Sequence, residues 1–245
     1  MPRPLPACAR LVMANKERNK IVSFPRSGIS WLFLRTNRFL LHRFGIEDTS
    51  PTARFLSHSH LGYLPHNDKT VIHHSMRHKL NYPEGTRVTV LLRDARSILA
   101  SVYHYRRRNV NGCCEIASEF VASNTGASCL SAFLNDVALL ASRAEKNKWD
   151  LRFIYYEDML DPLFLDCIPD ILGLGCVLTD IEREALAEDS NFIVHPSRLY
   201  ERLNDADSNY QKNKYKEAFG EKDVRFIEDH MKRFCKLRQY SVRYC

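Results

Sequence analysis

Short apolar runs alternate along the chain with longer stretches in which apolar residues recur every three or four positions. The apolar runs predict β-strands at 21–25, 87–92 and 151–156, with two further short candidates at 54–57 and 70–73. The longer stretches predict helices at 28–44, 98–105, 130–146, 162–173, 179–188 and 222–237. Because strands and helices alternate, we expect an α/β fold with a largely parallel central sheet flanked by helices.

The length of the chain predicts one domain. Its 245 residues suffice for a single α/β domain with a full core, which we assign to 21–245. Residues 1–20 are polar, contain three prolines and are expected to form a loose tail. The sequence has no signal-peptide core and no apolar run near the ~18 residues of a membrane span. We therefore expect a cytoplasmic protein without a membrane span.

The charge balance is basic, with 36 Lys+Arg against 29 Asp+Glu and a formal net charge of +7. This balance favours an anionic partner, for which nucleic acid, an anionic membrane surface and a phosphate-bearing cofactor are the candidates. The densest basic run is only Arg106-Arg107-Arg108, and there is no zinc-finger spacing, so no nucleic-acid partner is expected. None of the eight cysteines forms a C-x-x-C pair, so we expect reduced thiols and no metal site.

Residues 21–32 predict a strand, a tight turn and a helix in immediate succession. The turn carries Arg26, Ser27 and Gly28 at the helix N-terminus. Unpaired N–H groups and the positive end of the helix dipole bind anions there, and Gly28 allows a close backbone approach. The Lys-Ser/Thr pair of a triphosphate-binding P-loop is missing, so no magnesium ligand is expected. An ordinary strand-to-helix turn is the alternative.

A second candidate for anion binding follows the predicted strand at 87–92. Arg93 comes at the carboxyl end of this strand, and Ser101 follows eight residues later, two turns into the next helix. The guanidinium and the hydroxyl together would hold a second phosphate by charge-assisted hydrogen bonds. A surface ion pair would explain an Arg-Asp pair at this place equally well.

Together the two motifs resemble the sulfotransferases that use 3′-phosphoadenosine-5′-phosphosulfate (PAPS). In that family the first loop holds the 5′-phosphosulfate and reads Pro-Lys/Arg-Ser/Thr-Gly-x-Thr/Ser-Trp-Leu, which residues 25–32 match. The second element holds the 3′-phosphate and reads Arg-Asn/Asp-Pro-Arg/Lys-Asp, with a Ser eight residues after the first Arg. Residues 93–97 depart from it at Ala95 and Ser97, and Ser101 is in register. The resemblance implies a P-loop-NTPase-like sulfotransferase fold and a cofactor that leaves as adenosine 3′,5′-bisphosphate (PAP).

Later segments extend the resemblance to about residue 230. It implies that Tyr156 reaches the adenine and that Ser190 and Phe192 line the nucleoside. Lys212 and Asn213 lie where the family has an Arg-Lys-Gly loop on the 3′-phosphate, of which only the Lys is retained. The nucleotide-binding residues implied are Arg26, Ser27, Gly28, Ile29, Ser30, Trp31, Arg93, Ser101, Tyr156, Ser190, Phe192, Lys212 and Asn213. Among them, Trp31 offers a face on which adenine can stack.

In-line sulfuryl transfer needs a base and a positive charge at the leaving oxygen. Arg26 is always charged and cannot act as an acid, so its expected role is electrostatic. Members of the family that act on small molecules use a His at the end of the strand between the two phosphate motifs, and the segment around His58 fits best. The alternatives are His73 or His74, and then His60. A histidine suits the role of the base because an unperturbed imidazole titrates near neutrality.

The sequence leaves two other functions open. One is a nucleotide kinase or another P-loop phosphotransferase, against which the missing magnesium pair argues. The other is a non-catalytic module that binds a nucleotide or nucleic acid. In the favoured reading the acceptor is a small molecule with a hydroxyl or an amine, bound by loops at 46–66, 109–128 and 196–221.

Overall fold

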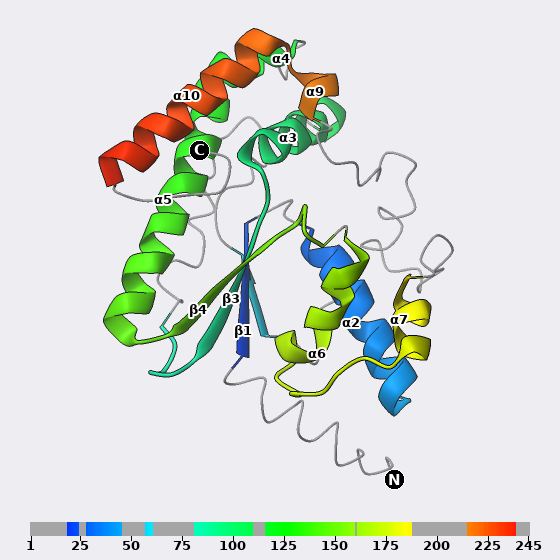
Figure 1. Ribbon diagram of the computed structural model, residues 1–245. Coiled ribbons are helices and arrows are strands. Elements are labelled where there is room, and N and C mark those ends of the chain that lie inside the picture. The colour runs from blue at the N-terminus through cyan, green and yellow to red at the C-terminus, as the bar shows by residue number, and fades with distance from the viewer. Residues whose placement is uncertain are drawn as a thin grey trace.

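The centre of the molecule is a four-stranded parallel sheet with strand order β2-β1-β3-β4 (Figure 1). The structure is a computed structural model that describes residues 19–24, 28–45, 57–60, 81–109, 116–159, 161–187 and 215–238. The strands are β1 (Asn19–Ser23), β2 (Ser57–His60), β3 (Arg87–Leu92) and β4 (Asp150–Tyr155). The predicted α/β fold with a parallel sheet is therefore confirmed.

The three main strand predictions agree with β1, β3 and β4 to within two residues. Because β1 begins at Asn19, the last two residues of the predicted tail belong to the sheet, and 1–18 lie outside the described residues. Of the two short candidates, only Ser57 is described, as the first residue of β2. The assignment of 21–245 to one domain stays a prediction.

The predicted helices are present with shifted ends, and a short helix at 215–218 lies in a stretch that was expected to be a loop. They are α2 (Ile29–Phe44), α3 (Ala95–Asn109), α4 (Ala117–Ala122), α5 (Asn124–Asn147), the 3₁₀ helix η2 (Pro162–Cys167), α6 (Ile168–Ile171), α7 (Asp180–Ala187), α9 (Tyr215–Ala218) and α10 (Glu221–Arg238). α2 ends as predicted at Phe44, and the left-handed φ of 62° at the following Gly45 lets its N–H donate to the Leu41 carbonyl. α5 begins six residues before the predicted start because Ser123 Oγ accepts a hydrogen bond from the Gly126 N–H at 3.2 Å. None of the described helices is long and apolar enough to cross a membrane.

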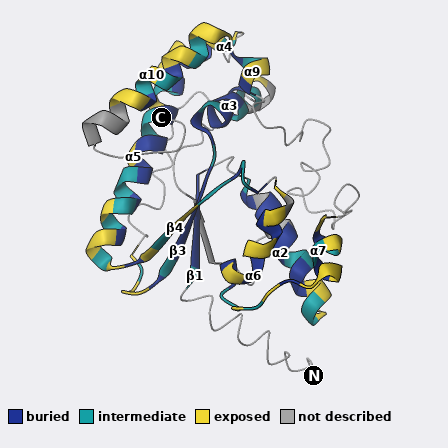
Figure 2. Ribbon diagram, viewed as in Figure 1, coloured by how far each residue is buried: buried dark blue, intermediate teal, exposed yellow. Residues whose placement is uncertain are grey.

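Different helices cover the two faces of the sheet (Figure 1). Along β1 and β3 the side chains alternate between two cores, as the pleat of a strand requires. Val22, Val88 and Val90 pack with α3, α5 and α10, whereas Ile21 and Leu91 pack with α2, α6 and α7. Figure 2 shows the buried residues along β1 and β3 and the exposed ones on the outer turns of α7 and α10. The sheet is thus the middle layer of three.

The connections that follow β1 and β3 run to opposite faces of the sheet. α2 follows β1, packs on one face and leads to β2. The segment α3–α5 follows β3, packs on the other face and leads to β4. Since β1 and β3 are neighbours, these connections diverge directly beyond their carboxyl ends. Ligands of open parallel sheets bind at such a point, so the fold predicts a binding site there.

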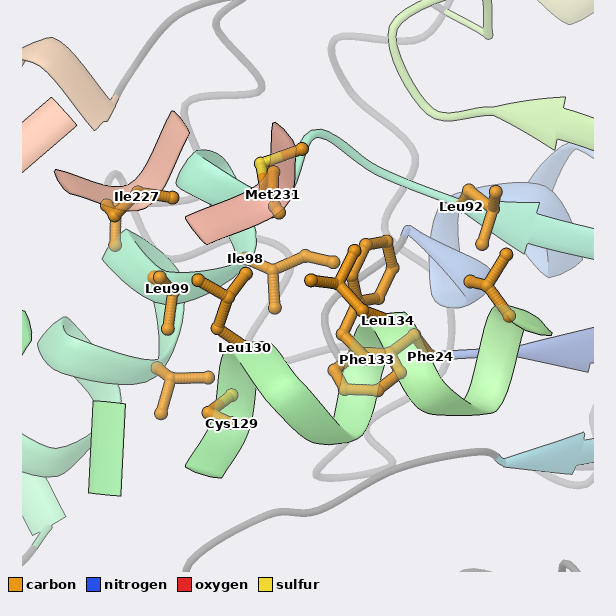
Figure 3. Close-up of a cluster of buried hydrophobic side chains, with 14 of the residues drawn as sticks. Phe24, Leu92, Ile98, Leu99, Cys129, Leu130, Phe133, Leu134, Ile227 and Met231 are labelled. Carbon is orange, nitrogen blue, oxygen red and sulfur yellow. The ribbon is translucent and has the colours of Figure 1, made fainter. Parts of the chain in front are cut away.

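The larger core packs α5 against β1 and α3. Phe133 of α5 meets Phe24 edge to face, with ring centroids 5.0 Å apart and an interplanar angle of 87°. Ile98 of α3 and Leu130 of α5 lie in the same cluster (Figure 3). Cys129 is fully buried in this cluster, and burial raises the pKa of its thiol to about 12.

We expect Phe133→Ala to lower the free energy of unfolding by about 3–5 kcal/mol, because it removes a buried ring and leaves a cavity. Phe133 is 2% exposed, whereas Phe226 on α10 is 50% exposed. Phe226→Ala is therefore the matched control, with an expected change below about 0.5 kcal/mol. Denaturant unfolding measures both, and equal losses would contradict the assignment of Phe133 to the core.

Candidate active site

Motif residues from separate parts of the chain meet beyond the carboxyl ends of the strands. Arg93 and Tyr156 directly follow β3 and β4, whose last residues, Leu92 and Tyr155, are paired in register. The Tyr156 N–H extends this pairing by donating to the Leu92 carbonyl at 2.8 Å. Gly28 comes from the connection after β1 and lies at the N-terminus of α2. The divergence point between β1 and β3 therefore gathers Gly28, Arg93 and Tyr156.

The ring of Tyr156 contacts both of the other two residues. Its side chain is buried, with the whole residue 2% exposed. A Cβ placed on Gly28 would be 2.3 Å from Tyr156 Cδ2 and 3.1 Å from Met159 Cε, so only glycine fits against this ring. The guanidinium carbon of Arg93 lies 4.6 Å from the ring centroid, which is the distance of a cation–π contact.

α2 directs its N-terminus at this place. Gly28 has a left-handed backbone with φ 87°, and its carbonyl accepts the first hydrogen bond of the helix from the Leu32 N–H at 3.1 Å. The first turn of α2 contains no acidic side chain. A 16-residue helix with this start presents N–H groups and positive dipole to an anion. Pro25, Arg26 and Ser27, the rest of the predicted cradle, lie outside the described residues.

The turn after β3 is built by Asp94 and Arg96. Asp94 caps α3 by accepting from the Arg96 N–H at 2.9 Å, and it pairs with the Arg96 guanidinium at 2.7 Å. Arg96 also donates to Glu228 of α10 and stacks on Tyr215, 4.5 Å from the ring centroid. Burial alone would lower the pKa of Arg96, but the hydrogen bonds and charges of its partners raise it. Arg96 is therefore a structural ion, and Arg93 is the arginine of this turn that lies on Tyr156.

Glu157 joins the end of β4 to the same turn. One carboxylate oxygen accepts a hydrogen bond from the Asp94 N–H at 3.1 Å. Burial raises the pKa of Glu157, and the hydrogen bond from Asp94 opposes this effect. These contacts give Glu157 a structural role next to Arg93 and Tyr156.

Other predicted nucleotide-binding residues of the first two motifs take different places. Trp31 is 7% exposed and packs between Arg35, 4.8 Å from the ring centroid, and Phe164, 6.1 Å away. Stacking of adenine on Trp31 would require this packing to open. Ile29 belongs to the core under α2, Ser30 lies in the first turn of α2, and Ser101 is half-buried in α3.

The strand register orders the two candidate bases on β2. His60 is paired with Ser23 and His58 with Ile21, so His60 lies at the carboxyl end of the strand. Since a strand advances about 3.3 Å per residue, His58 lies about 7 Å further from the edge at which Arg93 sits. Ser190, Phe192, Lys212, Asn213, His73 and His74 lie outside the described residues.

The contacts that hold the Arg93 turn were not predicted from the sequence. The capping role of Asp94 was readable, because an Asp directly before a helix is a common N-cap. The pairing of Arg96 with Glu228 spans 132 residues and has no local signature. Among the residues that the structure describes, no group of three or more His, Cys, Asp or Glu could hold a metal ion.

Gly28→Ala should destabilise the protein more than Gly45→Ala does. Both glycines have positive φ, 87° and 62°, so each alanine costs about 1–2 kcal/mol in backbone strain. Only Gly28 faces a ring at 2.3 Å, whereas a Cβ on Gly45 would meet nothing within 4 Å. We expect a further loss of about 1–3 kcal/mol for Gly28→Ala in denaturant unfolding. Equal losses for the two variants would show that Tyr156 does not pack against Gly28.

Comparison with known proteins identifies the fold of the chain. No protein-family model and no curated protein matches the chain in sequence. Among solved structures, the mouse sulfotransferase SULT7A1 in complex with PAP is similar, with a TM-score of 0.56 and 17% sequence identity. The match covers 91% of this chain and 88% of that one. The chain therefore has the fold of a sulfotransferase, which confirms the fold implied by the two phosphate motifs.

Proposed function

We propose that the chain is a sulfotransferase that moves the sulfuryl group of PAPS to a hydroxyl or an amine of a small molecule. The observation that carries the proposal is that Gly28 and Arg93 both contact the Tyr156 ring where the connections of β1 and β3 diverge. The similar mouse sulfotransferase was crystallised with PAP. Together they favour a nucleotide ligand over the alternative of an ordinary strand-to-helix turn.

The residues at this edge fit a nucleotide with phosphates at both ends of its ribose. The N-terminus of α2 suits the 5′ group, and the Arg93 guanidinium suits the 3′-phosphate, to which it can donate two parallel hydrogen bonds. When bound, PAPS supplies the sulfuryl group and the leaving nucleotide. In this proposal Arg26, Ser27 and Ser30 hold the phosphosulfate, and Ser101 and Lys212 assist Arg93. The resemblance alone suggests further residues that would contact the nucleotide: Tyr156, Ser190, Phe192 and Asn213.

Arg26 and a histidine divide the remaining chemistry. Arg26 would keep a fixed positive charge beside the oxygen on which negative charge develops, and it can do so at any physiological pH. A His at the end of β2 would take the proton of the acceptor. His58 fits the resemblance best, whereas the register supports His60, which is nearer to the carboxyl edge. No metal ion is needed for these roles.

Binding of PAP tests the proposal directly. We expect saturable binding at micromolar concentration in calorimetry. Arg93→Ala should lower the affinity for PAP tenfold or more, since a hydrogen bond to a charged group contributes about 1.5–3 kcal/mol. The same variant should lower the affinity for adenosine 5′-phosphosulfate much less, because this nucleotide has no 3′-phosphate.

Arg87→Ala is the matched control for this experiment. Arg87 lies at the opposite end of the same strand and pairs with Asp150 and Asp170 at 3.2 and 3.0 Å. We expect Arg87→Ala to leave the affinities for both nucleotides unchanged. Absence of PAP binding by the unmodified protein would contradict the proposed function, and equal losses in Arg93→Ala would contradict the role of Arg93.

Single alanine variants of His58, His60, His73 and His74 test the base. Once a screen with labelled PAPS has found an acceptor, we expect one of them to lose about 10²–10⁴-fold in turnover, the usual contribution of a general base. The affinity for PAP should stay unchanged in that variant. If all four variants transfer sulfate at the unmodified rate, none of these histidines is the base.

A further inference from the structure

We infer that Tyr156 is a positioning residue, one whose ring holds Gly28 and Arg93 in place so that both ends of the nucleotide meet a single rigid support. The inference rests on the proposed function. It differs from the role implied by the resemblance, in which Tyr156 reaches the adenine. It assigns to Tyr156 the recognition of the 3′-phosphate through Arg93.

Burial and contacts fix the ring itself. Tyr156 is 2% exposed and shares the core under α2 with Ile21, Leu91 and Met159. Its backbone N–H is bound to the Leu92 carbonyl at 2.8 Å, one residue before Arg93. A ring held by both the sheet and the core has little freedom to move, so it can fix the positions of the groups that pack against it.

The two groups that contact the Tyr156 ring are the ones proposed to bind the two ends of the nucleotide. The Arg93 guanidinium carbon lies 4.6 Å from the ring centroid. The Gly28 backbone packs so closely that an added Cβ would be 2.3 Å from a ring carbon. Moving the ring would therefore displace the start of α2 and the guanidinium together.

A stacked guanidinium is already ordered before the ligand arrives. Arg has a long side chain that loses rotamer freedom on binding, and a ring face that orders it beforehand lowers this cost. Asp94 and Glu228 compensate the charge of the neighbouring Arg96. Arg93 is the arginine of this turn that stacks on Tyr156, so discrimination between nucleotides with and without a 3′-phosphate should depend on Arg93 and on the ring beneath it.

The test compares the affinities for PAP and for adenosine 5′-monophosphate in calorimetry. Their ratio measures recognition of the 3′-phosphate, and a general loss of stability would not change it. Tyr156→Leu removes the ring, and we expect the ratio to fall about tenfold, as for a partly desolvated cation–π contact. Tyr156→Phe keeps the ring and should keep the ratio. Tyr155→Leu, the same change one residue earlier on β4, is the control and should also keep it.

The double variant Arg93→Ala/Tyr156→Leu separates the two roles. If Tyr156 acts through Arg93, the second change leaves the ratio of Arg93→Ala unaltered. A direct contact between Tyr156 and the adenine instead predicts equal losses for both nucleotides, with or without Arg93. That result, or an unchanged ratio in Tyr156→Leu, would overturn the inference.

A fluorinated ring covers the case in which Tyr156→Leu does not fold. Tyr156→trifluorophenylalanine keeps the shape of the ring but weakens the negative face that attracts a cation. We expect the ratio to fall relative to Tyr156→Phe, and an unchanged ratio would overturn the inference. If the unmodified protein binds no PAP, the proposed function itself fails. If it binds PAP and the variants keep the ratio, only the positioning role fails.

Discussion

Two neighbouring parallel strands whose connections run to opposite faces of a sheet cannot be covered by the same element at their carboxyl ends. This constraint acts on β1 and β3, because α2 packs on one face and α3 and α5 pack on the other. Tyr156 directly follows β4 at the same edge of the sheet, and its ring contacts Gly28 and Arg93. The location of the site is thus a consequence of strand order, and the motif residues supply its chemistry.

Two arginines of one turn have separate tasks. Arg96 bonds to Asp94 and Glu228 and fixes α10 to the turn, at the desolvation cost that buried charges require. Arg93 instead lies on the ring of Tyr156 at the carboxyl edge of the sheet. At the amino edge, the ion pairs of Arg87 with Asp150 and Asp170 are part-exposed, and such pairs contribute little to stability. The charges with a bearing on ligand binding therefore gather at one edge.

Much of the fold follows from local patterns in the sequence. β3 was predicted at its observed bounds because Val88, Val90, Leu91 and Leu92 concentrate apolar side chains between two polar stretches, and α2 ends at the predicted residue. The start of α5 was missed because the cap at Ser123 lies in a stretch without apolar periodicity. Trp31 matched the motif, yet it packs against Arg35, a neighbour four residues on along the same helix face. The contact of Arg96 with Glu228 was beyond prediction, since it depends on how α10 docks.

In the proposed complex one nucleotide spans the divergence point, with a phosphate at each side of its ribose. A crystal structure of the protein with PAP tests this most directly. We predict the 5′-phosphate at the N-terminus of α2 beside Gly28, and the 3′-phosphate within hydrogen-bond distance of the Arg93 guanidinium, with the Tyr156 ring beneath that guanidinium. A nucleotide bound at another place, or a 3′-phosphate that does not contact Arg93, would contradict the claim.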